Sequence, residues 1–461
     1  MTRVTDLDLH DTARGLAGGD FSARELVEAY LERISALDGE LNSFVVVLAD
    51  SALAGAARAD LRRAKRSRLG PLDGIPLAVK DNIDIAGVPT TNGLARHDGL
   101  EPAAVDAFAI TRLRAAGAVF IGKSNMDEGA LGGGTDNPHH GRTQNPWRIG
   151  HTAGGSSGGS AAATAGRLAV AALGSDTMGS VRIPASYCGV VGLKPTFGLV
   201  STRGVAPMSW RLDHLGVLCR SVRDCSLLLR VIAGPDPDCM ESVQPPNGFN
   251  LSTPPGHGLA GQRIGLITNF AEVPLHPDVA AGFSKALKLL GDLGCEVREL
   301  ELANYRPTPA RLAGLLVGEA ESAVFHEAAI RQHPEIYSPY YTEMITFGST
   351  TSGLKLMKAE RRVRSAAHRF LQLFRDVNLI VSPTVPGTAY PFDAGGEPYQ
   401  ADMLALANFA GCPAISIPCG LDSGGLPTGL QLVAAPWCDG ELIAAATSLE
   451  SALQFNVRPP L

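Results

Sequence analysis

Two short loops rich in serine and glycine hold the residues best suited to chemistry in this sequence. The first, "HTAGGSSGGSAAATAG", spans His151–Gly166 and contains Ser156; the second, "GSDTMGSVRIPASYCGVVGLKPT", begins at Gly174 and contains Ser180. A serine hydroxyl becomes a good nucleophile only when a positioned base removes its proton. Lys80 follows the strand-like run "IPLAV", and a lysine kept neutral by burial can be that base. The pattern therefore indicates serine nucleophilic catalysis with a lysine base.

The glycine-rich stretch at residues 151–166 has two other interpretations. A flexible linker would have polar, low-complexity flanks, whereas this stretch continues into "SAAATAGRLAVAALGSD", the pattern of a helix followed by a strand. A phosphate loop would need a lysine after its glycines or a GxGxxG turn after a strand, and neither is present. His151 is the only histidine in the two loops and lies five residues before Ser156. We therefore interpret the stretch as the wall of an active site.

Three motifs in order along the chain resemble a known enzyme family. "AVKDNI", "GGSSGGSAA" and "GSDTMGSVRIPASYCGVVGLKPTFG" together are similar to the amidase signature family of amide hydrolases, and Ser180 lies 24 positions beyond Ser156, as that family's catalytic serines do. "GAVFIGKSNMDEGALGGGTDN" and "GLPTGLQLVA" also look like family segments, so the resemblance covers most of the chain. It implies an α/β fold with a single large mixed, mostly parallel β-sheet covered by helices on both faces. It also implies one amidase domain over residues 1–461, with an N-terminal helical segment at about residues 1–65 packed on it.

The resemblance implies a role for each residue of the expected site. Ser180 is the nucleophile, a cis peptide bond joins Ser156 to its neighbour, and Lys80 starts a proton relay through Ser156 to Ser180. Backbone N–H groups stabilise the developing oxyanion, and those of the expected hole belong to Thr177, Met178, Gly179 and Ser180. Met178 departs from the family pattern, in which glycine is common here. We therefore expect an ordinary backbone conformation at Met178 and a side chain that lines the acyl pocket.

Further residues are expected to support or border this relay. The supporting residues are Ser157, Ser175, Asp176 and Arg182. Asp176 and Arg182 would form a buried ion pair that braces the nucleophile loop, and the two serines would tune Lys80 through hydrogen bonds. "WRLDHLG" resembles a family segment near the substrate, which makes Asp213 and His214 candidates for the substrate pocket. The alternative is that this segment is an ordinary turn.

The flanking sequence alternates between helical and strand-like patterns. Ser22 and Glu25 have the spacing of a capping box at the start of an amphipathic helix. Leu168–Leu173 has the pattern of a strand, and residues 278–293 that of a helix between the strands "RIGLIT" and "CEVRELEL". Because this alternation is typical of βαβ units, it also favours a mostly parallel sheet. The segment at residues 234–258, rich in proline and glycine, is a candidate linker.

Composition and charge limit the classes of protein. The chain has 461 residues, a net charge of −6, and 45% hydrophobic and 19% charged residues, which fits a globular protein and gives no electrostatic reason to expect nucleic acid or a membrane as partner. The basic run at residues 62–68 has no interleaved aromatic residues and indicates a solvated surface. No long apolar stretch or cleavable leader is evident. We expect a cytoplasmic protein without membrane attachment; a homodimer is left open.

The sequence predicts neither a cofactor nor a metal. Its eight cysteines contain no CxxC pair, and we expect them to be reduced and mostly buried. His139 and His140 are adjacent, so their side chains should diverge rather than share a metal.

These observations predict an amidase that hydrolyses a carboxamide-type carbon–nitrogen bond to an acid and ammonia or an amine through a Ser180 acyl-enzyme. Its partner would be a small-molecule amide. Two alternatives stay open: the glutaminase (A) subunit of a glutamyl-tRNA amidotransferase, which would bring tRNA and a partner subunit, and a hydrolase of small urea-like amides such as carboxybiuret. Met178, and "DHLG" where the glutaminase subunit is expected to have "DQIG", favour the other two functions. A protein that only binds would not need Lys80, Ser156 and Ser180 together.

Overall fold

A large sheet forms the centre of the computed structural model, which describes residues 3–97, 99–251 and 258–461. Its strands are β1 Phe44–Val47, β2 Pro76–Lys80, β3 Val119–Ser124, β8 Ala171–Asp176, β9 Val191–Lys194, β10 His214–Cys219, β11 Arg263–Ile267, β12 Glu296–Leu300, β13 Leu379–Pro383, β14 Ala414–Leu421 and β15 Pro427–Ala434. Two hairpin-like pairs stand apart from it: β4 Asp136–Asn137 with β5 Gly141–Arg142, and β6 Gln144–Asn145 with β7 Arg148–Thr152.

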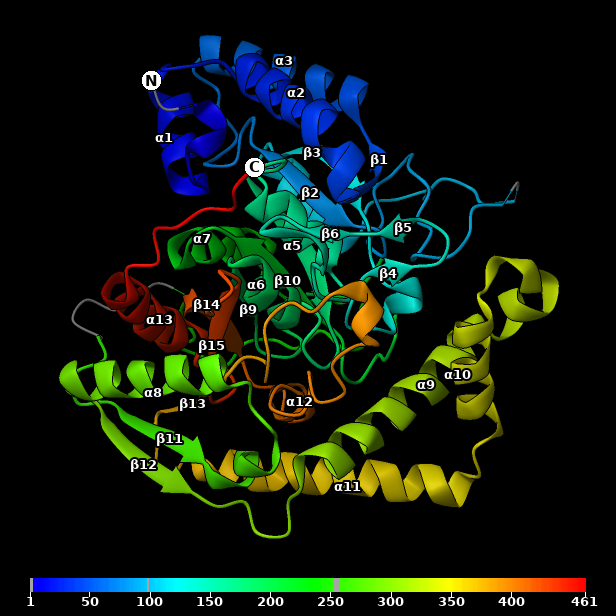
Figure 1. The fold of residues 1–461 in the computed structure, drawn as a ribbon. Coiled ribbons are helices and arrows are strands. Elements are labelled where there is room, and N and C mark those ends of the chain that lie inside the picture. Colours follow the sequence, from blue (N-terminus) through cyan, green and yellow to red (C-terminus); the bar gives the residue numbers. More distant parts are fainter. Residues whose placement is uncertain (1–2, 98, 252–257) are drawn as a thin grey trace.

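The strand order of the sheet is β1-β3-β2-β8-β10-β9-β14-β15-β13-β11-β12 (Figure 1). β14 and β15 come last along the chain, yet they lie in the middle of the sheet, between β9 and β13. The expected mixed α/β sheet is confirmed. The expected majority of parallel pairs is wrong: within the described ranges, four strand pairs of this sheet are parallel and six are antiparallel. The reason is that β10, β14 and β15 each run against both of their neighbours.

Helices cover the sheet in two groups. The α-helices are α1 Leu9–Gly18, α2 Ala23–Leu41, α3 Ala49–Ala64, α4 Phe108–Ala115, α5 Gly158–Ala165, α6 Arg182–Cys188, α7 Val222–Ile232, α8 Pro277–Asp292, α9 Pro307–Gln332, α10 Pro339–Thr350, α11 Gly353–Leu373, α12 Ala405–Phe409 and α13 Asp439–Leu453. Short 3₁₀ turns are η1 Val4–Asp6, η2 Glu128–Ala130, η3 Thr268–Glu272, η4 Pro334–Ile336 and η5 Phe392–Ala394. α5 and α6 pack together on strands from β2 to β15, while α7, α13 and α8 form a second contiguous group. Helices on both faces are therefore confirmed.

The N-terminal helices begin and pack as the sequence predicts. Ser22 and Glu25 form the capping box of α2, and Tyr30 is fully buried on the inner face of that helix. α2 packs on α3, which packs on β3, so the described part of the 1–65 segment lies against one end of the sheet (Figure 1). The assignment of the whole chain to one domain stays a prediction.

One local prediction differs from the structure in part, and a second falls partly outside the described residues. The strand expected at Leu168–Leu173 is β8, which begins at Ala171 and continues to Asp176. Within the candidate linker, residues 234–251 and 258 form no helix or strand, and residues 252–257 lie outside the described ranges. No helix in the described part of the chain is both long and apolar enough to cross a bilayer.

Candidate active site

Lys80 is the last residue of β2, a strand that lies between β3 and β8 and is buried along its whole length. The side chain has no exposed surface. Its Nζ lies 2.7 Å from Ser156 Oγ and 2.8 Å from Ser175 Oγ, and Asn82 Nδ2 donates to the same Ser175 hydroxyl at 3.0 Å. Among the described residues no carboxylate forms an ion pair with Lys80, so burial lowers the pKa of its ammonium to about 7 against the weaker opposing pull of Asp127.

The first serine loop comes directly before α5. The peptide bond between Gly155 and Ser156 is cis, as expected from the resemblance. A Cβ at Gly155 would lie 2.0 Å from Asp127 Oδ2, so only glycine fits at this point of the loop. The backbone N–H of Asp127 donates to Ser156 O at 3.2 Å, which fixes the loop from the other side.

The second serine loop joins β8 to α6 and lies against the first. The backbone N–H of Ser157 donates to Ser180 O at 3.2 Å, so the two loops meet at the two expected catalytic serines. Gly179 has a positive φ of +127°. Met178, in the same loop, does not have a positive φ, as the sequence predicts. Among the described residues, no hydrogen bond joins the hydroxyls of Ser156 and Ser180.

The expected oxyanion hole loses one of its four donors. The N–H of Gly179 donates to Asp176 Oδ1 at 2.7 Å, so it is not available to a substrate. The N–H groups of Thr177, Met178 and Ser180 make no hydrogen bond to another described residue. The expectation for Gly179 is therefore corrected, because the carboxylate that shapes the loop occupies its N–H.

The expected ion pair of Asp176 and Arg182 is present and fully buried. Arg182 Nη2 donates to Asp176 Oδ1 at 2.8 Å and Nε donates to Oδ2 at 3.0 Å. Burial alone would raise the pKa of Asp176, but the charge and hydrogen bonds of Arg182, together with the charge of Lys194 and the hydrogen bond of Asn408, outweigh it and hold that pKa far below its usual range. Because Asp176 also accepts the N–H groups of Gly179 and Val181, the pair fixes the shape of the nucleophile loop.

The two supporting serines differ in what they touch. Ser175 contacts Lys80 as expected. The hydroxyl of Ser157 instead donates to the backbone carbonyl of Ser175 at 3.2 Å, and no hydrogen bond joins it to Lys80 among the described residues, so the expectation that Ser157 tunes Lys80 by a hydrogen bond is wrong.

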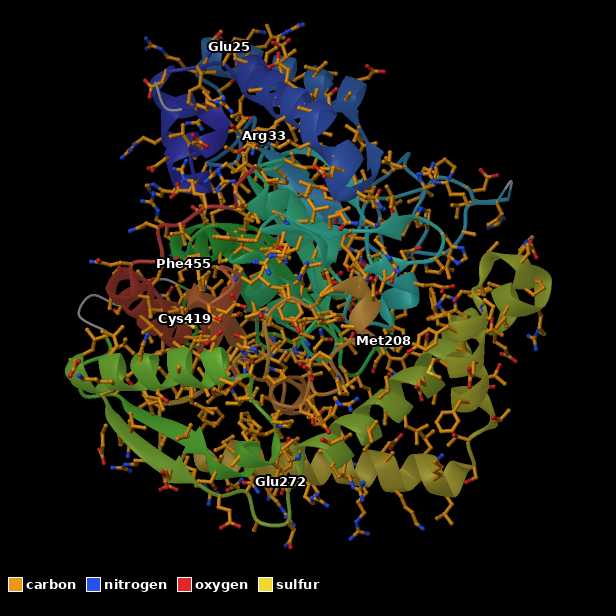
Figure 2. The ribbon with its side chains drawn as sticks, viewed as in Figure 1. Glu25, Arg33, Met208, Glu272, Cys419 and Phe455 are labelled. Carbon is orange, nitrogen blue, oxygen red and sulfur yellow. The ribbon has the colours of Figure 1, made fainter. Side chains whose placement is uncertain are left out.

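Ser180 lines a cavity of about 290 Å³. Its walls combine residues from the second serine loop and the start of α6, from η2 and the segment after it, from the segment before β10, from α9, from the start of α10 and from the segment before α12: Ala130, Leu131, Gly132, Gly133, Thr177, Met178, Ser180, Ile183, Met208, Arg311, Leu315, Tyr340, Glu397, Pro398, Gln400 and Ala401. Met208, labelled in Figure 2, packs between the η2 segment and α9. The expected place of Met178 on the pocket wall agrees with this cavity.

Asp213 and His214 do not line this cavity, contrary to expectation. Asp213 Oδ1 accepts the hydroxyl of Thr177 at 2.5 Å, so it supports the loop from behind. His214 is buried, with Nδ1 2.7 Å from Leu212 O and its ring edge-on to Phe197. Burial holds the pKa of His214 well below its ordinary value, so the ring is uncharged.

Comparisons with known proteins show the family of the chain. The family model described as Amidase matches residues 25–443. The chain belongs to the Amidase family. It is 38% identical to the A subunit of a glutamyl-tRNA(Gln) amidotransferase from Synechococcus sp. (strain CC9605), with 98% of each chain covered. Members of this family hydrolyse carbon–nitrogen bonds.

Two solved structures are similar to the chain over nearly its whole length. One was reported with the words "an unexpected vestigial protein complex reveals the evolutionary origins of an s-triazine catabolic enzyme"; it is 35% identical, with a TM-score of 0.90 over 99% of this chain and 100% of that chain. The other is the A subunit of glutamyl-tRNA(Gln) amidotransferase from Thermotoga maritima, 29% identical with a TM-score of 0.82 over 99% of this chain and 97% of that chain.

Three residues around this Amidase-family site were not predicted from the sequence. Asn408 accepts from Arg182 at 2.6 Å, and Gln431 also accepts from Arg182, so residues far along the chain complete the ion pair. Asp127 lies beside the first serine loop, and burial raises its pKa to about 6. Of the three, Asp127 and Gln431 lie within the recognised segments "KSNMDEG" and "GLPTGLQLVA", but their contacts with the site were not predicted.

The described part of the chain contains no group of three His, Cys, Asp or Glu side chains placed to hold a metal. His139 Nε2 lies 3.1 Å from Glu128 Oε1, whereas His140 Nε2 lies 2.9 Å from Leu94 O, so the adjacent pair diverges as predicted. The eight cysteines, all within the described ranges, form no disulfide.

Proposed function

We propose that this protein hydrolyses the carbon–nitrogen bond of a small carboxamide through an acyl-enzyme on Ser180. The observation that carries the proposal is the contact of a buried, readily neutral Lys80 amine with Ser156 at 2.7 Å, in a loop bonded to the Ser180 loop. A neutral amine is a base, and a hydroxyl can both accept and pass on a proton. Ser180 is the member of this group that lines the cavity.

The steps follow from this order of groups. Lys80 Nζ accepts the proton of Ser156 while Ser156 Oγ accepts that of Ser180, and Ser180 Oγ bonds to the amide carbon. The carbonyl oxygen takes up the negative charge and binds the free N–H groups of the loop. When the carbon–nitrogen bond breaks, the proton returns from Lys80 through Ser156 to the leaving nitrogen. Water then adds to the ester by the same relay and releases the acid. The serine hydroxyls come into hydrogen-bond contact when substrate is bound, since such contacts are often loose in free enzymes.

For the amide itself, the curated relatives favour glutamine. The chain is similar over 98% of its length to the A subunit of a glutamyl-tRNA(Gln) amidotransferase, which supports that role more than the role of a free-standing amidase. In the amidotransferase role the protein releases ammonia from glutamine, and a partner subunit uses it.

A second candidate is hydrolysis of a small urea-like amide by the isolated chain. The structure connected with an s-triazine catabolic enzyme has a higher TM-score, 0.90, than the amidotransferase structure from Thermotoga maritima, 0.82. Met178 on the cavity wall also favours this candidate, because a thioether narrows the space for an acyl group.

Ammonia release from a panel of amides tests both candidates. The panel contains glutamine, aliphatic and aryl amides and biuret-like compounds, each measured with the purified protein and with Ser180→Ala as the matched control. Glutamine hydrolysis that rises strongly on adding tRNA and partner subunits supports the amidotransferase role, and fast release from a biuret-like compound by the isolated chain supports the second candidate. Unchanged hydrolysis by a folded Ser180→Ala variant would contradict the mechanism itself.

A further inference from the structure

The cavity that Ser180 lines has one charged group of each sign on its wall. Arg311, on the second turn of α9, is its only cation and Glu397 its only carboxylate among the described lining residues. Most of the other lining side chains are apolar, including Met178, Leu315 and Ile183. A charged group in such surroundings is poorly solvated, so it binds an opposite charge more strongly than a surface residue does.

Arg311 is held in place by a buried carboxylate. Its Nε donates to Asp402 Oδ1 at 2.5 Å, and the hydroxyl of Thr308 donates to the other carboxylate oxygen. The side chain of Asp402 has no exposed surface, while that of Arg311 is 16% exposed. The contact joins α9 to the segment before α12, two walls of the cavity, which lie side by side in Figure 1.

The two terminal nitrogens of Arg311 make no hydrogen bond to another described residue. A guanidinium whose Nε is occupied still presents a planar pair of terminal N–H donors, which matches the two oxygens of a carboxylate. Because Asp402 fixes the side chain beforehand, little conformational entropy is lost when a ligand binds.

We propose that Arg311 anchors a carboxylate of the substrate, so that this protein acts on small amides that carry an acid group at the end away from the scissile bond. The inference rests on the proposed amide hydrolysis and adds the substrate class. The competing explanation is that the Arg311–Asp402 pair only ties α9 to its neighbour. The two explanations predict different effects of replacing Arg311. Loss of a carboxylate-binding group would affect acidic amides alone, whereas loss of a purely structural contact would affect every substrate equally.

The test compares amides that differ only in the acid group. Monoamides of four- and five-carbon dicarboxylic acids are paired with the neutral amides of the same length, and KM and kcat are measured for wild type, Arg311→Met and Arg311→Lys. Arg306→Met is the matched control, since Arg306 precedes α9, is largely exposed and lies outside the cavity. We expect Arg311→Met to raise KM for the acidic amides by about 10- to 100-fold, the range of a charge-assisted hydrogen bond, with KM for the neutral amides changed by less than about threefold.

Arg311→Lys keeps a cation beside Asp402 and loses the planar fork, so it carries the test if Arg311→Met fails to fold. We expect it to raise KM for the acidic amides by about 5- to 20-fold. Equal losses on acidic and neutral amides, or no loss on either, would overturn the inference.

A binding measurement separates this inference from the proposed function. Calorimetric titration of the Ser180→Ala protein with the same amides needs no turnover. Tighter binding of the acidic amide that disappears in Ser180→Ala/Arg311→Met supports the anchor even if the wild-type protein hydrolyses none of the panel. Equal affinity for acidic and neutral amides in the Ser180→Ala protein would reject it.

Discussion

Two buried lysines, Lys80 and Lys194, have similarly lowered pKa values but contact different groups. Each is the last residue of its strand, β2 or β9, and neither has exposed surface. Burial lowers the pKa of each ammonium to about 7. Lys80 contacts the hydroxyls of Ser156 and Ser175, whereas Lys194 donates to the carbonyl oxygens of Pro195 and Cys412.

The comparison shows why a lowered pKa does not identify a catalytic base. A hydroxyl can give a proton to a neutral amine and take another from a neighbour, but a backbone carbonyl has no proton to give. Lys80 therefore connects to a chain of exchangeable protons, while Lys194 connects two stretches of backbone. The partners of a buried amine decide its role.

Replacing Lys80 with Met should have the largest effect on activity. Met keeps most of the side-chain volume but removes the base, so we expect kcat to fall by about 10³-fold or more. Single-turnover and steady-state kinetics with the best amide of the panel measure this. Activity within tenfold of wild type in a folded Lys80→Met protein would show that another group removes the proton of Ser180.

The pH profile should follow the titration of Lys80. Below its pKa of about 7 the ammonium cannot accept a proton, so kcat/KM should rise by about tenfold per pH unit up to near pH 7 and then level off. Initial rates between about pH 5 and pH 9 test this. If Lys194 were the base, the inflection would vanish in Lys194→Met; we expect it to stay unchanged there.

Replacing Ser175 with Ala should have an intermediate effect. The substitution removes one of the two hydroxyls that hold Lys80, and we expect kcat to fall by about tenfold, the effect of one hydrogen bond. Ser157→Ala is the matched control, because within the described part of the chain that hydroxyl bonds only to Ser175 O, and its loss should change kcat by less than about threefold. A larger effect of Ser157→Ala than of Ser175→Ala would reverse this order.

Replacing Lys194 with Met should affect stability and barely affect chemistry. The substitution leaves the carbonyls of Pro195 and Cys412 without their donor, so we expect the free energy of unfolding to fall by about 1–3 kcal/mol. Urea denaturation measures this, and kcat of the folded variant should stay within about threefold of wild type. A loss of kcat comparable to that of Lys80→Met would remove the distinction between the two lysines.

The local sequence was sufficient to predict the structural features that depend on one short segment. The capping box of Ser22 and Glu25, the helix at Pro277–Asp292 and the place of Lys80 at the end of a strand all follow from patterns within a few residues. The ordinary backbone of Met178 also followed, because a side chain with a Cβ avoids positive φ.

Such local patterns could not predict which strands and side chains from distant parts of the chain become neighbours. Strand direction depends on which strands become neighbours, so β10, β14 and β15 made the sheet less parallel than the alternation of elements indicated. Arg182 meets Asn408 and Gln431 across more than two hundred residues of chain, and nothing near any of the three signals the contact. Gly179 was misassigned because its N–H competes with a carboxylate that the motif could not orient.

The central place of β14 and β15 has a consequence for how the chain is made. A nascent polypeptide that has emerged from the ribosome only as far as residue 413 has β9 and β13 but not the strands that lie between them. The facing edges of β9 and β13 stay unpaired until β14 and β15 have been synthesised. During that time these edges are exposed to wrong pairing with other chains. Gln431, a partner of Arg182 beside the nucleophile loop, arrives with that hairpin, so catalytic competence should emerge only when synthesis is nearly finished.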